Sequence, residues 1–150
     1  MKYGFLTLSQ VRVLKYRILG YSLRETASKL GVSHQTVAVI EKRALENIRR
    51  AETTLLVYNL LSSKVKLIIR PGTKLVEIPS ILVREADKKN VKIRGDFTLI
   101  YKLLRYRAGN CISNGRVVKP VLVLVTREGL VEIYPFKEIR SIYEEIERIG

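Results

Sequence analysis

The side chains best suited to recognising a nucleic acid lie close together, within residues 33–43. Gln35 carries an amide that can make a paired contact with adenine, and Ala38 or Val39 can touch the methyl group of thymine. His34 can bond a base edge, or bind a phosphate when it is protonated. If these four residues share one helix face, they can read base pairs in the major groove of DNA. The alternative interpretation of His34 is a solvated surface residue without a role in binding.

A second set of residues in the same region suits the phosphate backbone. Hydroxyl, ammonium and guanidinium groups donate to phosphate oxygens, and helix amino termini assist them. The residues predicted to contact the DNA backbone are Ser22, Ser33, Thr36, Lys42 and Arg43. For Lys42 and Arg43 an ordinary charged helix surface is the alternative, because Glu41 and Glu46 are close in sequence.

Catalytic and metal-binding chemistry find little support in the sequence. The chain has a single cysteine, Cys111, and its single histidine, His34, already belongs to the candidate reading face. A disulfide framework and a Cys/His zinc cluster are therefore excluded. Residues 109–115 lack the spacing of a phosphate-binding glycine loop. We expect no catalytic residue, no cofactor and no metal, and hence a protein that is not an enzyme.

Local signals in residues 1–61 predict the helices that would position these side chains. Residues 7–10 and 22–25 have the T-x-x-Q and S-x-x-E forms of capping boxes, which start helices. Gly20 and Gly31 can end the first two helices, and Ser33 can begin a third that runs past residue 55.

Residues 23–42 fit a helix-turn-helix. The pattern places small or apolar residues where helices must meet, and a glycine where the chain turns with positive φ. We expect Thr26, Ala27 and Leu30 to face inward, Gly31 to make the turn, Val32 to tuck under it, and Val37 and Ile40 to anchor the third helix. Ala44 continues the buried side of that helix, opposite the predicted reading face.

Residues 62–150 change character and predict a small α+β domain. Residues 65–69 read as a strand, 80–89 and 97–107 as helices, and 117–126 with 130–134 as a hairpin turning at Gly129. The apolar stripe from Ile139 to Ile149 predicts a closing helix. The fold class is thus α+β, with a helix-turn-helix domain over 1–61 and a second domain over 62–150 for dimerisation or effector sensing.

The third helix carries an apolar stripe longer than a DNA-binding head needs. Its members follow spacings of three and four residues: Val37, Ile40, Ala44, Ile48, Ala51, Leu55 and Tyr58. Two chains that pair along this stripe would form a homodimer presenting two heads. Packing against the chain's own second domain is an equally good interpretation. The aliphatic strands could also line a pocket for a small effector, which nothing in the sequence names.

Composition and charge point to a polyanionic partner. The 150 residues include 28 Lys+Arg and 14 Asp+Glu, for a net charge of +14, and 47% hydrophobic residues suffice for packed cores. Residues 88–107 are especially basic. The longest aliphatic run, Val121 to Val125, is too short to span a membrane, and the first residues do not resemble a signal peptide. We expect a cytoplasmic protein whose partner is double-stranded DNA, without a membrane partner. A nucleoid or RNA-binding protein acting by charge is the rival function, and heat adaptation is a plainer reason for the charge.

Three segments give the chain a family resemblance. These are Lys2-Tyr3-Gly4-Phe5-Leu6-Thr7, Gly31-Val32-Ser33, and residues 40–48, Ile-Glu-Lys-Arg-Ala-Leu-Glu-Asn-Ile. They resemble the archaeal Tfx family of DNA-binding transcriptional regulators, and residues 22–48 are similar to region 4 of bacterial sigma factors. The resemblance implies sequence-specific binding to promoter DNA, with His34, Gln35, Ala38 and Val39 on base-facing positions. It extends more loosely to residues 71–73 and 85–88.

Overall fold

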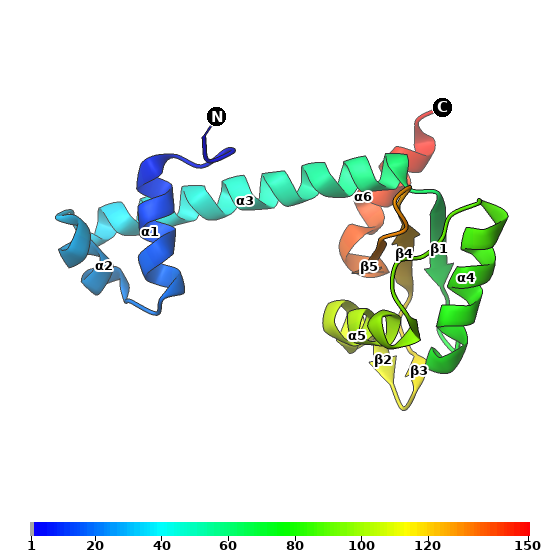
Figure 1. Cartoon of the computed structure of the whole chain (residues 1–150). Helices are drawn as coiled ribbons and strands as arrows, with labels where there is room; N and C mark the ends of the chain where they lie inside the picture. The colour runs from blue at the N-terminus through cyan, green and yellow to red at the C-terminus, as the bar shows by residue number, and fades with distance from the viewer. Residues whose placement is uncertain (1) are drawn as a thin grey trace. The chain divides into compact units, whose positions relative to one another are not determined.

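The computed structural model describes residues 2–150 (Figure 1). Its internal contacts divide the chain into an amino-terminal unit that ends at Leu56 and a carboxyl-terminal unit, Val57–Gly150. The long helix α3, His34–Ser62, contributes residues to both units. Among the described residues no helix is both long enough and apolar enough to cross a membrane.

The amino-terminal unit packs three helices around a small core. Helices α1 (Leu8–Ile18) and α2 (Leu23–Leu30) each begin with a complete capping box, at Thr7 and Ser22, which confirms both predicted helix starts. Val13, Ala27 and Val37 form the core, one from each helix, and three partly buried residues pack against it: Leu23, Leu30 and Ile40. Burial of these apolar side chains is the main force that holds the three helices together.

The turn between α2 and α3 is built on Gly31, which has φ +70°. The backbone N–H groups of Gly31 and Val32 both donate to the Ala27 carbonyl, which closes the end of α2. The Val32 side chain is 42% exposed, so the prediction that it tucks under the turn is wrong. The turn is held by backbone hydrogen bonds, and the core beneath it is already filled by Val13, Ala27 and Val37.

The carboxyl-terminal unit contains a three-stranded antiparallel sheet in the order β1-β4-β5. Its strands are β1 (Val65–Ile69), β4 (Val121–Val125) and β5 (Val131–Pro135). Every residue of the central strand β4 is buried. The other elements are η1 (Leu75–Glu77), α4 (Ile78–Lys88), α5 (Phe97–Ala108), η2 (Gly109–Cys111), β2 (Ile112–Ser113), β3 (Arg116–Val117) and α6 (Phe136–Arg148). This arrangement confirms the predicted α+β class.

Two predicted elements differ from the structure. The strand expected over 117–126 is interrupted, because Pro120 has no N–H for a ladder and the N–H groups of Val118 and Lys119 both donate to the Cys111 carbonyl. Val117 instead ends β3, which pairs with β2 in a separate hairpin. The closing helix α6 ends at Arg148, so Ile149, the last residue of the predicted stripe, is extended, exposed and outside the helix.

The predicted turn at Gly129 is present and depends on glycine. Gly129 has φ +86°, and a Cβ at this position would lie 2.0 Å from the Lys92 carbonyl oxygen. The Gly129 carbonyl accepts from the Arg94 N–H, so the hairpin turn is tied to the loop before α5. A side chain here would break that contact.

Candidate nucleic-acid interface

The first turn of α3 is capped by Ser33. The Ser33 Oγ accepts from the Thr36 N–H at 3.1 Å and lies 2.9 Å from the Thr36 Oγ1. Ser33 caps the start of α3, and the amino terminus of a helix attracts anions. Both hydroxyls are exposed, so the cap and the predicted phosphate contacts share one surface.

The four candidate base-reading residues lie on the side of α3 away from the core. Gln35 and Val39 are exposed, and His34 and Ala38 are half-buried. The opposite side of the helix carries Val37, which is fully buried. Residues three and four apart share one helix face, so positions 35, 38 and 39 form one surface. The structure thus brings the polar amide and two small apolar side chains together on an accessible face.

Three of the candidate backbone contacts are exposed on α2 and α3. Ser22 caps α2, where its Oγ accepts from the Glu25 N–H at 3.1 Å. Lys42 and Arg43 are exposed on the third turn of α3. Glu41, which made an ordinary charged surface plausible, is committed elsewhere: the Arg17 Nε donates to it at 2.6 Å. That ion pair joins α1 to α3 and leaves Lys42 and Arg43 free of Glu41.

Two further cations escaped the sequence reasoning. Arg24 and Lys29 are exposed on α2, and the Lys29 ammonium lies 5.8 Å from the centre of the Tyr21 ring. In a helix-turn-helix the helix before the reading helix crosses the phosphate backbone. The cationic residues of α2 in the sequence could have predicted that Arg24 and Lys29 also contact the DNA backbone.

The part of the chain that the structure describes contains no group of three His, Cys, Asp or Glu side chains placed to hold a metal ion. Cys111 is 2% exposed, and burial raises the pKa of its thiol. The thiol therefore stays protonated and behaves as a small packing residue.

Three packed helices, a left-handed glycine turn and an exposed polar face at the start of the third helix define a helix-turn-helix of the DNA-binding type. Comparison with known families agrees with this class. Residues 6–50 match region 4 of the Sigma-70 family, and residues 51–133 match the family described as DNA-binding protein TFX, C-terminal part.

Individual relatives extend over nearly the whole chain. A protein of Methanococcus vannielii is 31% identical over 92% of this chain and 97% of its own length. The DNA-binding protein Tfx of Methanothermobacter marburgensis is 34% identical over 85% of this chain and 93% of its own length. The protein of the same name from Methanothermobacter thermautotrophicus gives the same values. The chain belongs to the Tfx family of DNA-binding proteins.

Proposed function

We propose that this chain, as a DNA-binding transcriptional regulator of the Tfx family, recognises its target by laying the first turns of α3 in the major groove. The observation that carries the proposal is the two-sided character of these turns. Val37 is fully buried in the three-helix core, while Gln35 and Val39 are exposed on the other side. A helix that is packed on the core along one side and exposed along the other can enter the major groove.

In this proposal the exposed face carries two kinds of contact. Gln35 pairs with an adenine edge, Ala38 and Val39 contact thymine methyl groups, and His34 bonds a base edge. The phosphate contacts come from Ser22, Ser33, Thr36, Lys42 and Arg43. None of these steps needs a catalytic group, so we propose a regulator without enzymatic activity that acts in the cytoplasm, where it meets DNA.

We propose that residues 1–61 act as the DNA-binding domain and residues 62–150 as the domain for dimerisation or effector sensing. The second unit offers a place for a small effector, between the end of α4 and the start of α5. Val83, Ala86, Phe97 and Ile100 line an apolar pocket there, and Asp87 and Lys92 also line it. This lining suits a small amphipathic molecule.

We also propose that the protein acts as a homodimer paired through α3. Ile48, Ala51, Leu55 and Tyr58, called the α3 stripe below, alternate in steps of three and four residues, as the seam of a coiled coil does. Leu55 is 61% exposed and Tyr58 is 66% exposed, so large apolar side chains of the stripe stand in solvent. The residues at 49, 50 and 53 are polar, so the stripe is bordered by polar side chains on one side of the helix.

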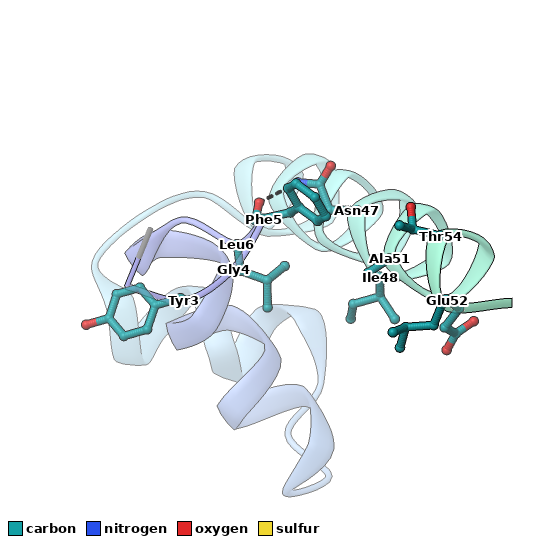
Figure 2. A pocket seen from close by; sticks show the side chains of 10 residues that line it. Tyr3, Gly4, Phe5, Leu6, Asn47, Ile48, Ala51, Glu52 and Thr54 are labelled. Carbon is teal, nitrogen blue, oxygen red and sulfur yellow. Dashed lines mark hydrogen bonds between the residues drawn. The ribbon is translucent and has the colours of Figure 1, made fainter. Parts of the chain in front are cut away.

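The amino-terminal segment widens this apolar surface. Tyr3, Phe5 and Leu6 form one wall of a groove whose other wall is α3 from Asn47 to Leu55 (Figure 2). The Asn47 side-chain amide donates to the Phe5 carbonyl at 3.1 Å and fixes that wall. A second copy seated on the α3 stripe would cover the Phe5 ring, which is 58% exposed. Two paired heads then match a pseudo-palindromic DNA site.

Selection from a random pool of duplex DNA tests the proposed function. One enriched motif is the expected result, and two inverted copies of it would support the homodimer. A pool without enrichment would favour the rival function, binding of nucleic acid by charge alone.

Two substitutions separate base reading from backbone binding. We expect Gln35→Ala to lower the preference for the selected site over random duplex by about 1–3 kcal/mol, because it removes a paired base contact. Lys42→Ala should instead weaken all duplexes alike and reduce the salt dependence by about one phosphate contact. Titrations by fluorescence anisotropy against both duplexes measure the two effects. An equal loss for both duplexes in Gln35→Ala would remove Gln35 from the reading face.

A further inference from the structure

A group of cationic side chains in the carboxyl-terminal unit lies at the end of its sheet next to the β2–β3 hairpin. Four cationic side chains belong to this region: Arg70 and Lys74 in the turn after β1, Arg105 in the last turn of α5, and Arg116 in β3. All four are exposed. We call them the hairpin-end cations.

Hydrogen bonds bring the turn after β1 against the hairpin. The Gly72 N–H donates to the Val117 carbonyl at 2.7 Å, and the Leu75 N–H donates to the Gly115 carbonyl at 2.9 Å. Lys74 and Arg116 face each other across an antiparallel bridge. The Arg116 guanidinium donates to the Gly72 carbonyl at 3.1 Å, so it lies across the turn that carries Arg70 and Lys74.

Arg105 joins the same region through a shallow hollow. Its side chain lines the hollow together with Leu75, Gly109 and residues 112–115. The Ser113 hydroxyl, the Asn114 amide and the Arg105 guanidinium are all donors that phosphate oxygens accept. The hairpin turn has positive φ at both Asn114 and Gly115, the arrangement of a tight two-residue turn, so the hollow is held by rigid backbone.

Acidic residues are scarce at this end. The sequence contains no Asp or Glu between Asp96 and Glu128, and none between Glu52 and Glu77. Glu77, two residues beyond Leu75, is the nearest carboxylate in sequence to Lys74. The other cationic part of the unit, residues 88–94 with Arg127, is mixed with Asp87, Asp96 and Glu128. The cations outnumber the acids in these segments, although Glu77 is close to Lys74 and Glu138 acts on Cys111 beside β2. The excess positive charge costs stability through mutual repulsion, which an anionic partner relieves.

We propose that the hairpin-end cations are a second DNA-contact surface that binds the phosphate backbone of duplex DNA without reading its sequence. The proposal rests on the proposed function in one respect, that the chain works on duplex DNA. No aromatic residue lines the hollow, so it lacks the stacking platform that single-stranded nucleic acid needs. Donor side chains on rigid turns are instead what phosphate contacts use.

The test compares two triple variants of the full chain that lose the same charge. The first is Arg70→Gln, Lys74→Gln and Arg105→Gln; Arg116 is kept because it bonds the Gly72 carbonyl. The matched control is Lys64→Gln, Lys89→Gln and Arg127→Gln, exposed cations near the opposite end of the sheet, where Val65 and Val125 pair. Thermal unfolding of both variants checks that the unit remains folded.

Binding to random and selected duplexes is measured over a range of salt concentrations. For three lost phosphate contacts we expect the slope of log affinity against log salt to flatten by about 2.7, and affinity at 0.15 M salt to fall about 100-fold, in the first variant only. The preference for the selected site over random duplex should not change in the first variant. Gln35→Ala should lower that preference without changing the salt dependence. Equal losses in both variants would overturn the proposal, because net charge would then explain the effect. A loss confined to RNA or single-stranded DNA would also overturn it.

Discussion

Gly31 shows how one residue sets the angle at which the reading helix leaves α2. Its backbone lies at φ +70°, a conformation that an L side chain resists, and its N–H closes the end of α2 on the Ala27 carbonyl. No atom lies within 4 Å of the place where a Cβ would be. The requirement for glycine here is therefore conformational, and crowding plays no part in it.

We expect Gly31→Ala to destabilise the amino-terminal unit by about 1–2 kcal/mol, because alanine pays the cost of the left-handed conformation. Urea unfolding followed by circular dichroism measures this loss. Gly109→Ala is the matched control, since Gly109 has φ −58° and also has open space around it. A similar loss in both variants would contradict the conformational explanation.

For individual residues, some features of the candidate site could be predicted from the sequence and others could not. The residue types and spacing of His34, Gln35, Ala38 and Val39 predicted one helix face, and the structure places them on one. The ion pair of Arg17 with Glu41 could not be predicted, because the two residues are 24 positions apart and meet only through the packing of α1 on α3. The roles of His34, Gln35, Ala38 and Val39 toward DNA stay predictions.

At the scale of elements, α3 carries two surfaces on one continuous helix. Its first turns carry the candidate reading face, and the α3 stripe begins at Ile48, after the buried Ala44. Leu55 and Tyr58 of the stripe are exposed, and pairing of the stripe with a second chain stays a prediction. Leu60 is 1% exposed and belongs to the carboxyl-terminal unit, so α3 has a second, buried apolar side there.

If the chain pairs through the α3 stripe as proposed, we expect Leu55→Glu combined with Tyr58→Glu to give a monomer, because two charges would face their own copies across the seam. Sedimentation at micromolar concentration measures the change. Thr53→Glu combined with Arg49→Glu is the control, since these residues lie away from the stripe. A wild-type chain that sediments as a monomer at that concentration would count against the dimer itself.

The elements also show which signals in the sequence were sufficient. The helices of the amino-terminal unit were predictable because capping boxes and glycine stops are local. The β2–β3 hairpin was missed, although Asn114-Gly115 is the dipeptide typical of a two-residue hairpin turn. Its strands have only two residues each, too few to show an alternating pattern. Pro120 likewise marked the break that shortened β4.

At the scale of the whole molecule, charge governs how the chain meets DNA. The net charge is +14, and both units are cationic: residues 1–55 carry 10 basic and 4 acidic side chains, and residues 56–150 carry 18 and 10. Five ion pairs occur within the described residues, so most of the cations are unpaired there. These cations can displace counterions from phosphate groups in either unit.

We therefore expect the affinity of the full chain for random duplex to depend steeply on salt. If about six phosphates are neutralised, affinity should fall about 1000-fold between 50 and 200 mM salt. Anisotropy titrations at four salt concentrations give the slope. A slope corresponding to fewer than about two phosphates would contradict the view that excess charge serves DNA binding.

The unbroken course of α3 also sets a rule for how such a protein can change in length. Each residue inserted between the reading face and the α3 stripe turns one against the other by about 100° and separates them by about 1.5 Å. One inserted residue would aim the heads of a dimer away from the groove they should enter. Seven inserted residues return the two faces to within about 20° of their original phase. The part of α3 between the reading face and the α3 stripe can therefore lengthen or shorten by whole heptads, but not by single residues.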